Sequence, residues 1–496
     1  MALYEQLAQE FSRQIERGVL RPGERLPSVR ALGVSRGLSQ GTIMQAYYLL
    51  EDRGLVSTRP RSGYYVNARA RAPLPPPMLP DESPQPLDVT IGQLVWDIMD
   101  GIRQRDAVPL GSAFASPQLY PLTKLGQTLG ISARRLRPET LMADLPPGNA
   151  ELRRHIARRY LEIGIEVDAE SIVITNGASE ALLVSLYATT RPGDIVAIES
   201  PAHYIPLHTI ENSGRRALCI PTCCEEGMNL AALERALASQ PVRAVWAMPT
   251  FQNPTGALMP ARRKRELVEL LARHDVPLIE NDVYADLYYG EERPAPAKFW
   301  DRDGRVLHCG SFSKTLAPGY RVGWVAPGRY DTLARRHKFL LSVGTNVPSQ
   351  LALADFVHHG GFELHLRRLR ATLRQQRDHM LRAITRHFPA GTRVSRPQGG
   401  YFLWLQLPPG APDTVGLMHE ALRHGVTLAP GALFTPLAQF GSHLRLNYGQ
   451  PWSAEIERAV ATLGRLAGGA DPANAGAAND DALLAVPTDL ECPEAQ

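Results

Sequence analysis

The stretch that decides the fold of this chain is SFSKTLAPGYR, residues 311–321. It sets Lys314 among hydroxyl groups and places Arg321 seven residues later. A lysine amine can form a Schiff base with an aldehyde, and hydroxyl and guanidinium groups can hold a dianionic phosphate. The segment therefore predicts an anchor for a phosphorylated aldehyde. A lone lysine in a Ser/Gly-rich turn is more often a surface side chain, so the prediction depends on other segments.

Three other segments supply the remaining parts of such a site. Residues 176–179, NGAS, follow a strand-like run and open a helical one, where backbone N–H groups and the helix dipole favour a phosphate. Asn253 can donate a hydrogen bond to a phenolate oxygen, and Tyr284 in the run IENDVY can hold the same oxygen. Each segment alone is also an ordinary turn. Together with the lysine segment they predict a pyridoxal phosphate site.

A carboxylate ligand has a candidate partner near the C-terminus. Arg445 lies in the strand-like run LRLNY of a smaller C-terminal unit. An arginine can clamp a carboxylate through two parallel hydrogen bonds. The alternative is a strand-end arginine in a surface ion pair, and the sequence leaves both open.

The composition excludes several classes of protein. At 496 residues the chain is too long for a single core, and its 44% hydrophobic and 21% charged residues are ordinary for a soluble protein. No run of 18 apolar residues predicts a membrane span. The five cysteines show no CxxC spacing, so we predict no disulfide framework and no metal site. We expect a cytoplasmic protein without a signal peptide.

The positive charge of the chain is concentrated at its N-terminus. Residues 1–72 carry 11 basic and 6 acidic side chains, whereas the remainder carries 43 and 44. The apolar periodicity of residues 1–66 predicts three helices followed by two short strands, which is a winged helix-turn-helix. A small basic module of this kind indicates double-stranded DNA as its partner.

Within this module, the candidate DNA contacts lie at two places. Polar side chains at the start of the third helix are placed to meet base edges, and basic side chains on the second helix and the wing to meet phosphates. The glycine at the wing allows close approach. The predicted DNA-binding residues are Arg30, Ser39, Gln40, Thr42, Arg59, Arg61 and Gly63. The alternative is an ordinary helical bundle with solvated arginines.

The rest of the chain divides by composition. Residues 67–88 are Pro-rich and predict an extended linker rather than a packed element. In residues 89–466, strand-like and helical runs alternate, which predicts an α/β body with a mainly parallel sheet covered on both faces. A smaller α+β domain forms its C-terminal part. Residues 467–496 contain acids but no base and predict a disordered tail.

Two families share these motifs. Residues 3–7, 18–30, 39–46 and 62–66 resemble the GntR family of bacterial regulators. Residues 110–465 resemble fold-type I aminotransferases, which use pyridoxal phosphate. A chain that joins the two is similar to a MocR-type regulator. The resemblance implies a homodimer that binds DNA and a small amino compound.

The same resemblance implies roles for individual residues. Lys314 is the internal-aldimine lysine and so the catalytic residue, and Arg445 receives the carboxylate of a substrate or effector. The implied cofactor-binding residues are Gly177, Ala178, Ser179, His203, Tyr204, Asn253, Asn281, Asp282, Tyr284, Ser311, Ser313, Lys314 and Arg321.

Three departures from the aminotransferase pattern bear on activity. Asn281 stands where the family places an aspartate against the pyridine nitrogen, and Asp282 comes one residue late. His203 occupies the position of a stacking aromatic ring, with Tyr204 beside it. The tyrosine that usually reaches over from the partner subunit, near residues 143–144, is missing. We therefore expect a transcriptional regulator that senses an amino compound. A working aminotransferase that carries a DNA-binding module is the alternative.

Overall fold

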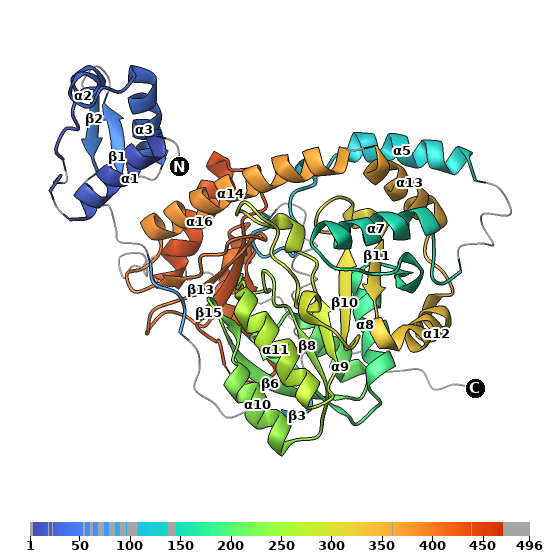
Figure 1. Cartoon of the computed structure of the whole chain (residues 1–496). Coiled ribbons are helices and arrows are strands. Elements are labelled where there is room, and N and C mark those ends of the chain that lie inside the picture. Colours follow the sequence, from blue (N-terminus) through green and yellow to red (C-terminus); the bar gives the residue numbers. More distant parts are fainter. Residues whose placement is uncertain are drawn as a thin grey trace.

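The computed structural model contains a small N-terminal domain and a large body, joined by a chain segment (Figure 1). The residues that the structure describes are 3–17, 19–21, 23–52, 55–59, 63–67, 74–78, 85–89, 96, 107–136, 145–359, 361–437 and 439–469.

The N-terminal domain is the predicted winged helix-turn-helix. It contains α1 (Leu3–Glu16), α2 (Val29–Arg36) and α3 (Gln40–Asp52), followed by the antiparallel hairpin of β1 (Val56–Arg59) and β2 (Gly63–Val66). The hydroxyl of Ser28 accepts the N–H of Ala31 and caps α2. The hydroxyl of Ser39 caps α3 by accepting the N–H of Thr42 at 3.1 Å. Side chains at helical spacing, such as Phe11 and Tyr47, fill its separate core.

Within the described residues, the large sheet of the body has nine strands, in the order β3-β6-β5-β8-β9-β10-β11-β4, with β7 paired to β6. The run from β6 to β10 is parallel, and β3, β7, β11 and β4 pair antiparallel. The predicted mainly parallel sheet is thus confirmed. Its strands are β3 (Pro86–Leu87), β4 (Val173–Thr175), β5 (Ile195–Ser200), β6 (Arg216–Cys223), β7 (Gly227–Met228), β8 (Val242–Ala247), β9 (Leu278–Asn281), β10 (Val306–Ser311) and β11 (Gly323–Ala326).

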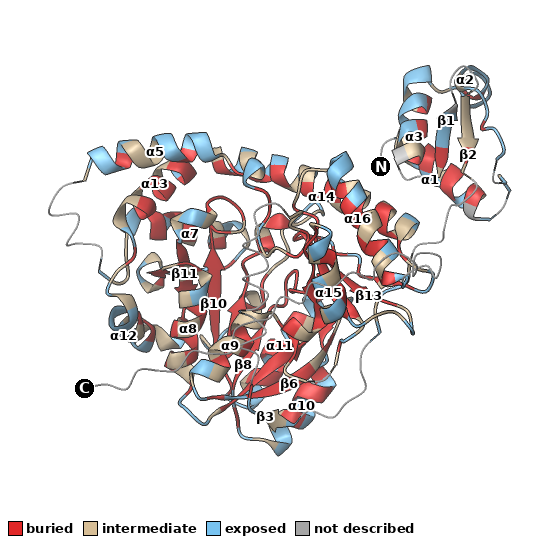
Figure 2. Ribbon diagram, turned by 180° about the vertical axis from the view of Figure 1, so that it is seen from behind, coloured by how far each residue is buried: buried red, intermediate tan, exposed pale blue. Residues whose placement is uncertain are grey.

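Helices cover both faces of this sheet, because its central strands are buried and mostly apolar on both faces (Figure 2). On β5, Val196 and Ile198 pack with the core beneath α8 and α9, whereas Ile195 and Ala197 pack on the other face with α10 and α11. The helices of the large domain are α5 (Leu122–Arg134), α7 (Ala150–Glu162), α8 (Ala178–Thr189), α9 (Tyr204–Asn212), α10 (Leu230–Ser239), α11 (Ala261–Arg273), α12 (Asp331–Ser342), α13 (Val347–His358) and α14 (Gly361–His387). Short 3-10 helices span Pro117–Leu119, Ala169–Ser171, Ala285–Leu287, Ala297–Trp300, Pro318–Tyr320, Gly328–Tyr330 and Gly431–Phe434.

The smaller C-terminal domain is built on a second sheet, which is antiparallel and has the order β12-β13-β15-β14. Two further helices and α14 pack on it, with Trp404 at the centre of the shared core. This is the predicted α+β unit. Its elements are β12 (Arg393–Val394), β13 (Phe402–Gln406), α15 (Thr414–Arg423), β14 (Ala429–Pro430), β15 (His443–Asn447) and α16 (Ala454–Ala467).

The Pro-rich segment differs from a linker without packed elements. Pro86–Leu87 form β3 and pair with β6, and Val89 is buried. The carbonyl of Pro75 accepts the N–H of Val394 at 2.8 Å, so the segment also contacts β12. Sequence reasoning missed these contacts because they join residues far apart in the chain.

Three other expectations concern the tail, membrane spans and the cysteines. The predicted disordered tail lies outside them from residue 470 onward. Among the described helices, none is both long and apolar enough to cross a membrane. The four described cysteines, Cys219, Cys223, Cys224 and Cys309, form no disulfide with one another.

Candidate cofactor and DNA-binding sites

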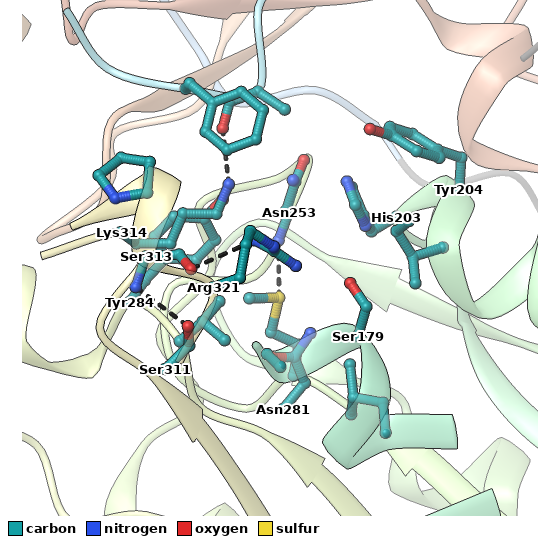
Figure 3. Close-up of a pocket in the computed structure, with 18 of the residues that line it drawn as sticks. Ser179, His203, Tyr204, Asn253, Asn281, Tyr284, Ser311, Ser313, Lys314 and Arg321 are labelled. Atoms are coloured by element: carbon teal, nitrogen blue, oxygen red, sulfur yellow. Dashed lines mark hydrogen bonds between the residues drawn. The ribbon is translucent and has the colours of Figure 1, made fainter. Parts of the chain in front are cut away.

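A cavity of about 520 Å³ opens where the parallel strands of the large sheet end. It is lined by the turn after β10, the first turn of α8, the start of α9 and residues 113–114. Lys314, Ser313 and Arg321 lie on one side of it, and His203 and Tyr204 on the other (Figure 3). Ligands of open α/β sheets bind at this end because loops and helix N-termini converge there.

Lys314 lies in the cavity without a carboxylate partner among the described residues. Its Nζ donates to the carbonyl of Ala113 at 2.8 Å and lies 4.2 Å from the centroid of the Phe114 ring. Burial, followed by the nearby charges of Arg445 and Arg321, lowers the pKa of Lys314 to about 7. Close to half of these amines are therefore neutral at neutral pH, which is the form that attacks an aldehyde.

Beside the lysine, a cradle for an anion is already formed. Gly177 has φ +78°, and a Cβ built there lies 2.6 Å from Nη2 of Arg321, so only glycine fits beneath this guanidinium. Nη1 of Arg321 donates to the hydroxyl of Ser313 at 3.3 Å. The hydroxyl of Ser311 accepts the N–H of Ser313 at 3.0 Å. Ala178 and Ser179 complete the cradle in the first turn of α8, where free N–H groups favour a phosphate.

Arg321 has an unusual backbone. Its φ of +54° and ψ of +44° place a non-glycine residue in the left-handed region, which costs roughly 1–2 kcal/mol. This conformation turns the guanidinium toward Gly177 and Ser313. Strain of this kind is typical of sites in which the backbone is fixed for a ligand.

The floor of the cavity decides between the two candidate partners of a pyridine nitrogen. Asn281, the last residue of β9, lines the cavity, and its Oδ1 is buried without a hydrogen-bond partner among the described residues. Asp282 points elsewhere, because its Oδ2 lies 3.0 Å from Nε2 of His308 and 3.2 Å from Nη2 of Arg293. The structure thus does not bring Asp282 to the cavity. Neighbouring residues at a strand end face opposite sides of the sheet.

Behind the floor lies a buried polar network that sequence reasoning missed. Nδ1 of His308 lies 2.6 Å from the hydroxyl of Tyr160, which in turn accepts the indole N–H of Trp324 at 3.1 Å. Ligand atoms of Glu280, Asp282 and His308 lie within 4.8 Å of one another. Both carboxylate oxygens of Glu280, however, accept backbone N–H groups, at 2.6 and 2.9 Å. We therefore interpret the cluster as a support for β9 and β10.

Arg445 of β15 approaches the cavity from the small sheet and contacts Asn253, which lines it. Its Nη1 donates to Oδ1 of Asn253 at 3.0 Å, and its Nη2 donates to the carbonyl of Gly111 at 2.7 Å. The side chain is buried, and among the described residues its Nε has no hydrogen-bond partner and no carboxylate pairs with it. A surface ion pair is thereby excluded for this arginine. A buried guanidinium whose partners are all neutral can still gain much from an anion.

The remaining predicted residues also meet at the cavity. The rings of His203 and Tyr204 lie 4.2 Å apart at 40°, at the start of α9. Burial, with the charges of Arg445 and Lys314, lowers the pKa of His203 well below its usual value, so its imidazole is neutral. Tyr284 is buried and lines the cavity near Asn253. The individual roles of these residues toward a cofactor stay predictions.

Several of the predicted DNA contacts lie at the surface of the N-terminal domain. Arg30, Ser39 and Gln40 are exposed, and the hydroxyls of Ser39 and Thr42 lie 2.8 Å apart. Gly63 has φ +104°, and a Cβ there lies 3.2 Å from Nε of Arg25. Arg25 is thus a further basic side chain at the wing that sequence reasoning missed.

The side chains of the two predicted wing arginines lie outside the described parts of the chain. The backbone of Arg59 ends β1, but its side chain is not among the described parts. Arg61 lies outside the described residues. Their contacts with phosphates stay predictions.

Comparisons with known proteins agree with this arrangement. The family of bacterial regulatory proteins named gntR matches residues 3–66, and aminotransferase class I and II matches residues 139–463. The chain is 41% identical to the uncharacterised HTH-type transcriptional regulator YdcR of Escherichia coli (strain K12), over 94% of this chain and 99% of that protein. It is 37% identical to the uncharacterised HTH-type transcriptional regulator YjiR of the same strain, over 94% and 98%. The chain belongs to the MocR-type regulators of the GntR family.

A solved structure shows the same body fold. LysN, the α-aminoadipate aminotransferase of Thermus thermophilus, matches with a TM-score of 0.68 and 29% identity, over 76% of this chain and 94% of that one. That structure holds N-(5'-phosphopyridoxyl)-L-leucine. The cofactor of the present MocR-type regulator is pyridoxal phosphate. Its own residues fit the group. The amine of Lys314, whose pKa is lowered, and the amide oxygen of Asn281, which has no hydrogen-bond partner among the described residues, belong to side chains that line one cavity. Beside this cavity, only glycine fits at position 177 beneath the guanidinium of Arg321.

Proposed function

We propose that this MocR-type regulator senses an amino compound in its body and reports it to DNA through the N-terminal domain. When bound, pyridoxal phosphate supplies an aldehyde for the ligand amine and a ring that can draw electrons from it. Arg445 binds the ligand carboxylate, and Lys314 gives or takes a proton near neutral pH. The ligand class is therefore an amino acid or a close analogue.

The observation that carries this proposal is Asn281 on the cavity floor. An amide has no charge and cannot hold a proton on a ring nitrogen as a carboxylate does. Among the described residues that line the cavity, none is Asp or Glu, whereas Lys314 and Arg321 are basic. Both features disfavour a protonated pyridine ring and hence fast turnover. Tight binding of a ligand needs neither a protonated pyridine ring nor fast turnover.

A ligand can shift the equilibrium between two arrangements of the protein only by as much as its binding free energies for the two arrangements differ. The carboxylate of a ligand competes with Oδ1 of Asn253 for Nη1 of Arg445, at present 3.0 Å away. Ligand binding thus replaces a contact between the large and small sheets. This is the differential interaction that a sensor requires.

We also propose that the regulator acts as a homodimer at the nucleoid. Helix α12 and the residue just after it expose a row of large apolar side chains, which monomers rarely leave in water. These are Leu333, Phe339, Leu340, Leu341 and Val343. A second copy of the chain fits this surface, because two helix-turn-helix modules related by a twofold axis read a palindromic DNA site. Light scattering of the purified protein measures the mass that tests this.

The experiment that tests the sensor compares DNA affinity with and without amino acids. The DNA is a duplex selected from a random-sequence pool by the protein loaded with pyridoxal phosphate. Each of the common amino acids is added, and the absorption of the cofactor reports its binding. The proposal is supported if at least one amino acid changes both the absorption and the DNA affinity. It fails if amino acids change the absorption and never the DNA affinity.

A second function, aminotransferase activity, is favoured by Lys314 and Arg445. The amine has a pKa of about 7, and the guanidinium lacks an ion-pair partner among the described residues. Release of a 2-oxo acid from an amino acid in a single turnover measures this activity. Fast release, followed by regeneration with another 2-oxo acid, favours an enzyme over a sensor.

A further inference from the structure

Residues 74–78 of the Pro-rich segment are bound to the small sheet. The carbonyl of Pro75 accepts the N–H of Val394 in β12 at 2.8 Å, and the carbonyl of Pro76 accepts Nη1 of Arg393 at 2.9 Å. These contacts fasten the segment along the edge of the sheet.

Two more contacts extend this attachment. The N–H of Met78 donates to Oε1 of Gln406, the last residue of β13, at 2.9 Å. Leu74 packs against the main hydrophobic core. The segment therefore moves with β12 and β13 rather than as a free tether.

Residues 85–89 of the same segment are bound to the large sheet instead. Pro86 and Leu87 pair with β6, and Nη2 of Arg216 donates to the carbonyl of Pro86 at 3.3 Å. Along the described residues that follow the N-terminal domain, the chain thus meets the small sheet first and the large sheet second. The attachment point of the DNA-binding domain lies on the small sheet.

The ligand site joins the same two sheets. Lys314 follows β10 of the large sheet, whereas Arg445 lies in β15 of the small sheet, opposite Trp404 of β13. The partner of β13 on its other side is β12, with Arg393 opposite Gln406. A ligand that is held at both ends sets the small sheet against the large one. Two adjacent strand pairings then connect Arg445 to the residues that hold Pro76 and Met78.

Space for a shift exists beside the segment. A cavity of about 170 Å³ lies next to Pro76, between the turn at Cys224 and Gly256 of the large domain and Arg396 of the small domain. Close packing between two domains resists their relative motion, and a void of this size removes some of the packing contacts beside residues 74–78.

We propose that residues 74–78 are the coupling element that carries the ligand-dependent position of the small sheet to the DNA-binding domain. This inference rests on the proposed sensor function and adds the route by which the signal leaves the body. The DNA-binding domain moves with the small sheet because the chain segment that connects the domain to the body is attached to that sheet at residues 74–78.

The length of the tether sets the size of the effect. From Asn67 to Leu74 the chain advances 7 residues, and from Asn67 to Gln85 it advances 18. Release of residues 74–78 raises the maximal reach from about 24 Å to about 60 Å. Effective concentration falls roughly as the −3/2 power of length, so the avidity of two linked DNA-binding domains drops about 4-fold. The DNA affinity then no longer depends on the ligand, because the new attachment point of the DNA-binding domain is on the large sheet.

The test uses two release variants of the full-length protein. One carries Arg393→Ala with Gln406→Ala, which removes the two side-chain contacts. The other replaces residues 74–78 by Gly-Ser-Gly-Ser-Gly, which also removes the packing of Leu74. Arg302→Ala is the matched control, since Arg302 is exposed on the large domain. Each protein is loaded with pyridoxal phosphate or with N-(5'-phosphopyridoxyl)-L-leucine, and its affinity for the selected DNA duplex is measured.

We expect the adduct to change the DNA affinity of the wild type and the control by at least about 5-fold, the low end for allosteric coupling. In the release variants this ratio falls to nearly one, while the affinity for the adduct is unchanged. A ratio that persists in both release variants overturns the coupling role of residues 74–78. If the wild type ignores the leucine adduct, the comparison is repeated with each amino acid that changes the absorption of the cofactor, and a wild type whose DNA affinity ignores them all overturns the sensor function itself.

Discussion

The pKa of Lys314 gives a prediction that can be worked through in numbers. Its fall from 10.5 to about 7 means that a protonated amine in this cavity costs about 5 kcal/mol more than in water. At neutral pH about half of the amines are neutral, compared with roughly 1 in 3,000 for an ordinary lysine. We therefore expect covalent attachment of pyridoxal phosphate about 10³-fold faster than at an unperturbed lysine of equal reactivity.

The sign of the pH dependence follows from the direction of the shift. A lysine is reactive when it has lost its proton, and Lys314 loses it at about pH 7. The attachment rate therefore rises about tenfold per pH unit below pH 7 and levels off above it. Replacement of Arg445 by Gln removes one nearby positive charge and raises the midpoint. Burial is the larger cause of the shift, so the midpoint stays below 10.5.

The assay mixes cofactor-free protein with pyridoxal phosphate and follows absorption against time between about pH 5 and pH 10. Borohydride reduction and mass spectrometry of peptides identify the modified residue. Lys264 serves as an internal control: its pKa is also lowered, to about 8, but its Nζ is bound to Thr250 and Ala295. A rate that keeps rising beyond about pH 9, or an unchanged adduct in Lys314→Ala, refutes the reasoning.

Three further predictions concern single residues. Asn281→Asp places a carboxylate on the cavity floor and should speed release of 2-oxo acid in a single turnover by at least about tenfold; an unchanged rate means that the floor does not limit chemistry. Gly177→Ala puts a Cβ 2.6 Å from Nη2 of Arg321 at φ +78°, and equilibrium titration should show pyridoxal phosphate binding weakened by about tenfold or more. Equal affinity would contradict the cradle. Arg30→Ala should weaken binding to all DNA sequences alike and reduce the slope of log affinity against log salt by about 1. A loss confined to one sequence would instead indicate a base contact.

Local signals explain why the N-terminal domain was predictable. Ser28 and Ser39 precede helices whose apolar residues recur at helical spacing, and the hydroxyls of both serines cap those helices. The parallel sheet could be predicted from the sequence equally well, because strands buried on both faces are mostly apolar along their whole length. The candidate residues of the cofactor site were predicted from the lysine segment and from the turns that follow β4, β8 and β9. Such turns share one edge of a parallel sheet whatever the details of packing.

Other features depended on contacts that no local pattern encodes. Ala113 and Phe114 contact Lys314 although about 200 residues separate them in the chain. Arg25 covers Gly63 only because the hairpin folds back beside it. Residues 74–78 are held by hydrogen bonds to β12 and β13. A Pro-rich composition does not predict such contacts.

The sequence by itself determined the two modules, the phosphate-binding turns and the lysine, because helix caps, strand burial and glycine turns act over a few neighbouring residues. Only the tertiary structure decided which of Asn281 and Asp282 faces the cavity. The strand end at β9 turns one side chain to the cavity and the next toward His308 and Arg293. That choice depends on the register between β9 and β10 and on the buried charges behind them, and both exist only once distant segments have packed.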